Sequence, residues 1–235
     1  MNKFLLIETA SISCSAAIAD ENGILASEQI LIPKAHASSL CPMIDNILKK
    51  TGLKTKDLSA IAVSEGPGSY TGLRVGLSTA KGLCFGSDIP LIGIGTLDIL
   101  AEEGKTHLNE NLKDNSIIIP MADARRMEVY TALYNNKAER MSEIIAKVLD
   151  ENSYEDEFNK YDSLIFIGDG SEKFKTCLNE EKLAKSIFVS TYPSAVYMLY
   201  PTLKKWKEKK FEDVAYFEPF YLKEFIAGIS KKSVL

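Results

Sequence analysis

One stretch of the sequence combines residue types that could bind an anion. Residues 65–76 read E-G-P-G-S-Y-T-G-L-R-V-G, and they stand between an apolar run that predicts a buried strand, 60–64, and a helical pattern over 71–85. In the first turn of a helix the free N–H groups and the helix dipole attract anions, and Thr71 is a candidate cap for that turn. A tight strand-to-helix turn with glycines for close packing explains the same residues equally well. On the sequence alone both interpretations stay open.

Other catalytic and metal-binding patterns are missing from the sequence. The loop is neither a Walker A loop nor a dinucleotide-binding G-x-G-x-x-G, and it lacks the G-x-S-x-G of a serine hydrolase. The two histidines, His36 and His107, form no H-E-x-x-H zinc motif. The cysteines at positions 14, 41, 84 and 177 form no C-x-x-C pair, which favours reduced thiols over a zinc site or disulfide framework. We therefore expect no metal site and assign no catalytic residue.

The charge balance limits the partners. The 235 residues include 28 lysines and arginines against 32 aspartates and glutamates, a net charge of -4, so no chain-wide field would concentrate nucleic acid. Any contact with RNA must then be local or belong to a partner. No run approaches the roughly 18 apolar residues of a membrane span, and Glu8 interrupts the first apolar run too early for a signal peptide. These features predict a cytoplasmic protein without a membrane partner.

The hydrophobic periodicity predicts the same order of elements twice. In the first half we expect strands over 4–9, 14–19 and 24–30, a helix over 38–50, a strand over 60–64, a helix over 71–85, a strand over 90–94 and a helix over 96–108. In the second half we expect strands over 117–122, 128–134 and 141–149, a weak helix over 154–160, a strand over 164–167, a helix over 170–183, a strand over 187–190 and a final helix opened by Pro193. This is an α/β protein with duplicated βββαβαβα lobes, divided as residues 1–110 and 111–235.

Three further features have an ordinary structural interpretation. Pro42 fits the helix over 38–50 if Ser38 or Ser39 is its cap, because proline then falls in the first turn. Arg125 and Arg126 are expected to position a hairpin, the alternative being that they face a cleft and contact phosphate. Lysines gather near the end of the last helix, at 204, 205, 207, 209 and 210, where a solvated face is expected.

Several motifs together resemble one known family. Residues 66–76 closely resemble the G-P-G-S-[FY]-T-G-L-R-[IV]-G signature of the TsaB (YeaZ) family, whose members act in making threonylcarbamoyladenosine beside the anticodon of tRNA. Weaker landmarks follow in the same order: L-L-I-E-T at 5–9, H-A-S-S-L-C-P-M-I at 36–44, D-A-R-R-M-E-V-Y at 123–130 and P-F-Y-L-K at 219–223. The resemblance covers nearly the whole chain.

The resemblance implies a fold of the actin-like ATPase superfamily, which includes sugar kinases, Hsp70 and actin. In that superfamily a nucleotide lies between the lobes, and a carboxylate at the end of each lobe's first strand holds the metal. The matching positions here are Glu8 and Asp123, and the matching glycine-rich loop contributes Gly66, Gly68, Thr71 and Gly72. Glutamate replaces the usual aspartate, and residues 10–13 contain no glycine for a phosphate hairpin. We therefore expect a vestigial or weak nucleotide cleft, with no cofactor of the chain's own and ATP only at the level of a complex.

The resemblance also implies a role. The related transferase TsaD binds a metal through H-x-x-x-H, but the residue four after His36 is Leu40. The chain is thus expected to be a non-catalytic subunit that binds and supports TsaD together with TsaE, reaches tRNA only through that complex, and can form a homodimer without TsaD. The alternative is an enzyme, a small-molecule kinase of the same superfamily.

Two helices are candidates for the partner surface. The helix over 71–85 is apolar or small around most of its circumference, so we expect it to be covered on more than one side. A four-helix contact with the equivalent pair of TsaD would provide that cover. The expected partner-binding residues are Leu40, Met43, Ile44 and Ile47 on the first helix and Leu73, Gly76, Leu77 and Ala80 on the second.

Overall fold

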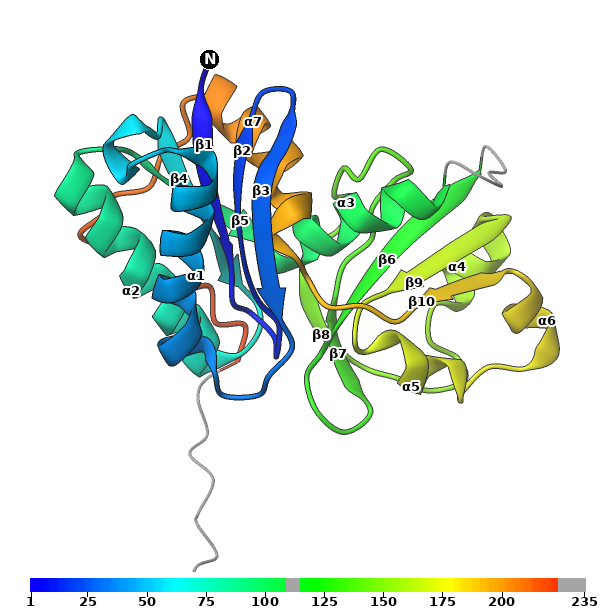
Figure 1. The fold of residues 1–235 in the computed structure, drawn as a ribbon. Coiled ribbons are helices and arrows are strands. Elements are labelled where there is room, and N and C mark those ends of the chain that lie inside the picture. Colours follow the sequence, from blue (N-terminus) through cyan, green and yellow to red (C-terminus); the bar gives the residue numbers. More distant parts are fainter. Residues whose placement is uncertain (109–114, 224–235) are drawn as a thin grey trace, which may run out of the picture.

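The computed structural model describes residues 1–108 and 115–223, which form two lobes, each built on a five-stranded sheet (Figure 1). The first sheet lies within residues 3–95 and the second within residues 116–189. Apolar runs such as 4–7 and 60–63 are fully buried, because both faces of the sheet are covered. The chain is an α/β protein, as the sequence predicts.

The first lobe begins with an antiparallel meander. Its elements in chain order are β1 (Lys3–Glu8), β2 (Cys14–Asp20), β3 (Gly23–Ile30), α1 (His36–Thr51), the 3-10 helix η1 (Thr55–Asp57), β4 (Ala60–Gly66), α2 (Tyr70–Ser87), β5 (Leu91–Gly95) and α3 (Thr96–Leu108). The strand order is β3-β2-β1-β4-β5, with β4 parallel to β1 and β5 parallel to β4. Helices α1 and α2 pack side by side on one face of this sheet (Figure 1).

The second lobe repeats this plan. Its elements are β6 (Ser116–Asp123), β7 (Glu128–Thr131), β8 (Ile145–Val148), α4 (Glu155–Lys160), β9 (Ser163–Ile167), α5 (Ser171–Lys175), α6 (Glu180–Ala184), β10 (Ser186–Val189), the 3-10 helix η2 (Ala195–Met198) and α7 (Leu199–Lys207). The strand order β8-β7-β6-β9-β10 matches that of the first sheet strand for strand. The predicted duplication of the βββαβαβα lobe is confirmed.

Three local expectations are wrong in the second lobe and at α1. Instead of one helix over 170–183 there are two short ones, because the Asn179 side chain accepts a hydrogen bond from Lys182 N and starts a new helix. Strand β8 begins at Ile145 rather than at 141, after a turn that the Asn135 side chain stabilises. Helix α1 begins at His36, so Pro42 lies inside the helix and not in its first turn.

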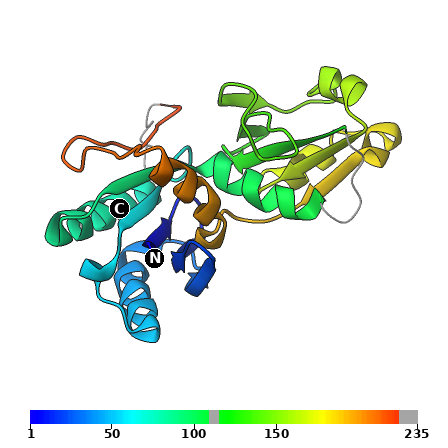
Figure 2. The ribbon, with the colours of Figure 1, turned by 90° about the horizontal axis from the view of Figure 1, so that it is seen from above.

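The two lobes exchange helices (Figure 2). Helix α3 follows the last strand of the first sheet but packs on the second, where Leu97 and Leu100 meet Ile118. In return, η2 and α7 pack on the first sheet, where the rings of Trp206 and Phe4 meet edge to face with their centroids 5.5 Å apart. The expected boundary between residues 110 and 111 lies outside the described residues.

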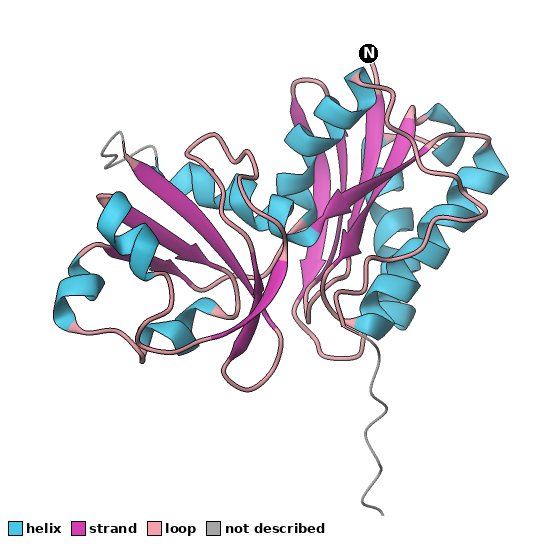
Figure 3. Cartoon of the chain, turned by 180° about the vertical axis from the view of Figure 1, so that it is seen from behind, coloured by secondary structure: helices cyan, strands magenta, loops and turns pink. Residues whose placement is uncertain are grey.

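A C-terminal strap, which we define as residues 208–223, returns from α7 to the glycine-rich loop (Figure 3). Glu212 N donates to the carbonyl of Leu91 at 2.9 Å, so the strap runs along the edge of β5. Phe220 N donates to the carbonyl of Glu65 at 2.7 Å. The strap thus covers the end of β4 and one side of α2.

Candidate functional site

The glycine-rich loop between β4 and α2 is capped by Ser69. The Ser69 hydroxyl accepts a hydrogen bond from Gly72 N at 3.2 Å, whereas Thr71, the expected cap, is an exposed residue of the first helical turn. Gly66 has a φ of 112°, a conformation that only glycine adopts readily. The sequence therefore identifies the loop correctly but not the residue that caps it.

The glycines of this motif bring the loop and α2 against the turn that follows β1. A Cβ atom at Gly68 would overlap the carbonyl oxygen of Ala10, and one at Gly72 would overlap that of Thr9. Ser69 N donates to Ala10 O at 2.6 Å. One of the N–H groups that could receive an anion is thus already bonded to the protein's own backbone. Of the two interpretations, the tight turn accounts for the positions of these glycines.

Glu8 lies at the end of β1 and is completely buried. One carboxylate oxygen accepts a hydrogen bond from Ala10 N, and the other, Oε2, has no partner in the part of the chain that the structure describes. Burial raises the pKa of Glu8 to about 7, although hydrogen bonds from Ala10 and Ser64 act in the opposite direction. A large fraction of Glu8 is therefore neutral near physiological pH.

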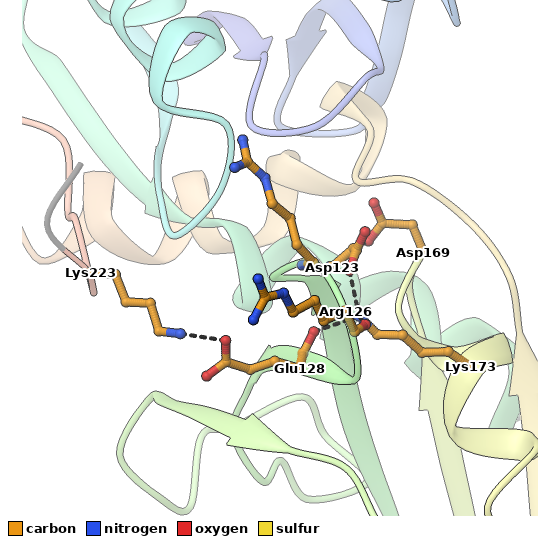
Figure 4. Close-up of polar contacts among 7 residues, drawn as sticks. Asp123, Arg126, Glu128, Asp169, Lys173 and Lys223 are labelled. Carbon is orange, nitrogen blue, oxygen red and sulfur yellow. Dashed lines mark hydrogen bonds and ion pairs between the residues drawn. The ribbon is translucent and has the colours of Figure 1, made fainter. Parts of the chain in front are cut away.

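Asp123 occupies the matching position at the end of β6, and its surroundings are different (Figure 4). Its carboxylate forms an ion pair with Lys173 and accepts a hydrogen bond from Arg125 N at 2.9 Å. Its own N–H donates to the Asp169 carboxylate at 2.9 Å. Burial raises the pKa of Asp169, and the negative charge of Asp123 raises it further. Asp123 thus anchors a hairpin.

The two carboxylates do not form a metal site. Glu8 is enclosed in its own turn, and Asp123 is paired with Lys173. No group of three or more histidine, cysteine, aspartate or glutamate side chains in residues 1–108 and 115–223 is placed to hold a metal ion. Because Ala10 also fills the space beneath Gly68, the expected nucleotide-binding residues do not fit a magnesium-bound phosphate.

An interlobe cleft of about 800 Å³ lies next to this loop. From the first lobe and the strap it is lined by Glu65, Gly66 and Phe220, and from the second lobe by residues 140–144. Burial raises the pKa of Glu65, while Lys205, 4.0 Å away, acts against that rise. The sequence does not reveal this cleft, because the strap and the 140–144 turn meet only in the folded chain.

The eight expected partner-binding residues lie inside the first lobe. Leu40, Met43, Ile44 and Ile47 of α1 and Leu73, Gly76, Leu77 and Ala80 of α2 are all buried. Their side chains pack inside the lobe, so other residues form the exposed surface of these two helices. The outward face of α2 instead carries Thr71, Arg74, Ser78, Gly82 and Phe85, and the Phe85 side chain is 86% exposed.

Two further expectations concern the histidine of α1 and the lysine-rich end of α7. The ring of His36 is buried and contacts the carbonyl of Ser13 at 3.1 Å, so it stabilises the start of α1. Lys205 does not belong to a solvated face, because its ammonium donates to the carbonyl of Gly93 at 2.6 Å. In the described part of the chain no helix has both the length and the hydropathy needed to cross a membrane.

Comparisons with known proteins agree along most of the chain. Residues 29–230 match the model of a protein family described as TsaD, tRNA N6-adenosine threonylcarbamoyltransferase. The chain is 29% identical to the tRNA threonylcarbamoyladenosine biosynthesis protein TsaB of Escherichia coli, covering 96% of each chain, and 30% identical to the protein of that name from Bacillus subtilis, covering 93% of each. Its fold is similar to the structure of YeaZ from Pseudomonas aeruginosa, with a TM-score of 0.79 at 23% identity over 94% of this chain and 100% of that one.

Proposed function

The chain belongs to the TsaB (YeaZ) family, and on that premise we propose that it acts in the biosynthesis of threonylcarbamoyladenosine in tRNA as a non-catalytic subunit. The curated relatives of similar length carry that pathway in their names. Within the pathway, the role that fits the residues of this chain is to support a catalytic partner. The proposed setting is the cytoplasm.

One observation carries the non-catalytic part of the proposal: the glycine-rich loop is packed against the protein's own backbone. The Ser69 N–H is bonded to Ala10 O, and Gly68 leaves no space there for a phosphate group. Glu8, the residue expected to help hold a metal, is buried with a raised pKa. A nucleotide site needs open N–H groups and carboxylates that can reach a metal ion, whereas here an N–H of the loop is bonded internally, Glu8 is buried and Asp123 is paired with Lys173.

The proposed partner is the TsaD transferase, with which this chain shares a family model over residues 29–230. The surface we propose for it is the outward face of α1 and α2. On α2 the small exposed residues Ser78 and Gly82 precede the exposed ring of Phe85 on the same face, and such an arrangement lets another helix approach closely beside one apolar anchor. The same face would serve a homodimer when TsaD is absent, and TsaE would join the assembled pair.

The proposal is tested by reconstitution with purified TsaD, TsaE and tRNA, with threonylcarbamoyl-adenylate supplied as donor. We expect modification only when this chain is present, and we expect it to elute with TsaD in gel filtration. Full modification without the chain would contradict the proposal. In a separate measurement, the chain alone should show no magnesium-dependent ATP binding by calorimetry.

The small-molecule kinase is not favoured. It would require ATP between Glu8, Asp123 and residues 66–72, where the turn after β1 and Lys173 already contact the groups that a nucleotide would use. Magnesium-dependent ATP binding to the isolated chain would restore that alternative.

A further inference from the structure

The turn that joins β6 to β7 places two arginines next to each other in a left-handed backbone conformation. Arg125 has a φ of 69° and Arg126 a φ of 48°. Glycine or asparagine adopts this conformation readily, whereas long side chains rarely do, and strained positions of this kind concentrate at functional sites. Two consecutive arginines at such positions make this turn a candidate functional feature.

The turn is held rigid by a network beneath it (Figure 4). The ammonium of Lys173 donates to the carboxylate of Asp123 and to the backbone carbonyls of Arg126, at 2.9 Å, and of Glu128. Ala124 N donates to Glu128 O at 3.1 Å and closes the hairpin. The backbone that carries the two arginines is therefore fixed before any ligand arrives.

Two of the acidic groups around the turn form ion pairs, and a third, Asp169, accepts a hydrogen bond from Asp123 N. Asp123 pairs with Lys173, and Glu128 pairs with Lys223 of the strap. Arg125 and Arg126 are both exposed, and within residues 1–108 and 115–223 neither guanidinium has an ion pair or hydrogen bond. In Figure 4 the Arg126 side chain points away from Lys173, toward the side of the turn where Glu128 lies. Two unpaired cations thus lie together in a chain whose net charge is -4.

The turn lies near the interlobe cleft, although none of its residues lines it. Phe220 lines the cleft, and Lys223, which pairs with Glu128, follows it by three residues. Three residues span at most about 11 Å of backbone. The Lys223–Glu128 pair, and the turn beside it, therefore lie within that distance of the cleft plus the length of the side chains. A ligand on the exposed arginines would therefore lie near the cleft.

From this placement we propose that the Arg125–Arg126 turn is a phosphate-binding site for the backbone of the tRNA substrate. Guanidinium groups bind phosphate oxygens through paired hydrogen bonds, and contacts of this kind position RNA without reading its sequence. The inference rests on the proposed function, because tRNA is the phosphate-bearing polymer of that pathway. It extends that function by giving this chain a direct contact with tRNA, which the net charge allows only locally.

The test compares two double variants that each remove two positive charges. Arg125→Gly with Arg126→Gly removes the proposed contacts and relieves the backbone, and Lys204→Ala with Lys207→Ala removes two exposed lysines of α7. Binding of an unmodified tRNA transcript is measured by filter retention at 50 and 200 mM salt, with the chain alone and with its complex with TsaD. The arginine variant should bind tRNA about 10- to 100-fold more weakly, with a salt slope lower by about 1 to 2. The lysine variant should stay within about threefold of the wild type.

Four measurements separate the alternatives: the melting midpoint, tRNA affinity, TsaD binding and ATP binding. The melting midpoint of the arginine variant should not fall by more than about 2 °C, since glycine suits both positions. Unchanged tRNA affinity of the arginine variant, or an equal loss in the lysine variant, overturns the proposal. So does loss of TsaD binding with tRNA affinity intact, which would make the turn a protein contact, or arginine-dependent binding of free ATP without tRNA binding. Failure of the wild-type chain to bind TsaD at all is read separately by gel filtration and counts against the proposed function.

Discussion

The backbone N–H of Ser69 donates a 2.6 Å hydrogen bond to the carbonyl oxygen of Ala10. This bond joins the N-terminus of α2 to the turn after β1, the two places where the resemblance implies phosphate contacts. In this chain these two segments bind each other instead. The same junction carries the glycines that are most specific to the motif, so its stability can be tested apart from its function.

We predict that Gly68→Val destabilises the protein by about 1 to 3 kcal/mol, because a Cβ at this position would overlap the Ala10 carbonyl. The cause is steric, since Gly68 is not among the glycines with positive φ. Urea denaturation followed by circular dichroism measures the change. Gly82→Ala is the matched control: it lies on the outward face of α2 with open space around it, and it should raise the stability by about 0.5 to 1 kcal/mol. Equal midpoints for Gly68→Val and the wild type would contradict the steric account.

The buried carboxyl of Glu8 should make stability depend on pH. Its pKa rises from 4.5 to about 7 on folding, so its contribution is fully present below about pH 4.5 and is lost as the pH rises through 7. That rise corresponds to about 3 kcal/mol. Denaturation measured at pH 5 and pH 8 gives the free energy of unfolding at each pH. Between pH 5 and pH 8 this free energy should decrease less for Glu8→Gln than for the wild type. Burial also raises the pKa of Glu65, Glu102, Glu103 and Asp169, so only the difference between the two proteins reports on Glu8. If the stability of the two proteins changed with pH in parallel, Glu8 would not be the source of the pH dependence.

Activity of the reconstituted complex should tolerate loss of either carboxylate. Glu8→Gln and Asp123→Asn, made separately, are expected to leave the rate of tRNA modification within a few-fold of the wild type, because Glu8 is completely buried and Asp123 is paired with Lys173. Circular dichroism checks that each variant is folded. A loss of about 100-fold, equivalent to about 2.7 kcal/mol of barrier, in a folded variant would assign the residue a part in the chemistry.

The partner surface is best tested at Phe85. Replacing this exposed ring by aspartate should weaken binding to TsaD by about 100-fold or more if the outward face of α2 is the contact, because a lone carboxylate would be buried there. Val148→Asp is the control, since that valine is 67% exposed but lies on β8 of the other lobe. Calorimetric titration with TsaD compares the two. Wild-type affinity of a folded Phe85→Asp chain would locate the contact elsewhere.

The repeated element order could be predicted because each strand and helix carries its own periodic pattern. Turn residues such as Gly52 and Gly23 mark element ends through positive φ, which is a local property. The cap of α2 was harder to assign, because Ser69 and Thr71 are both good capping residues. Which of them caps depends on how the loop meets Ala10, a contact between residues far apart in the sequence.

The cover of α2 could not be predicted for the same reason. Its apolar circumference indicates cover on more than one side, and the chain itself supplies most of that cover. Val214 and Phe217 of the strap join the core beneath α2, and Lys81 donates to the carbonyl of Ala215 at 3.1 Å. Helical periodicity predicts that a face is buried, but it does not predict which segment covers that face. The Lys223–Glu128 pair and the interlobe cleft depend on the same long-range return of the chain.

The exchange of α3 and α7 makes the two lobes depend on each other for solubility. A chain cut between residues 108 and 115 would separate α3 from the sheet that buries Leu97 and Leu100, and it would bare the face of the first sheet that η2 and α7 cover. Neither fragment could fold with a closed core, whereas co-expressed fragments could restore each other. Because each lobe covers part of the other's sheet, the two lobes are expected to unfold together rather than one after the other.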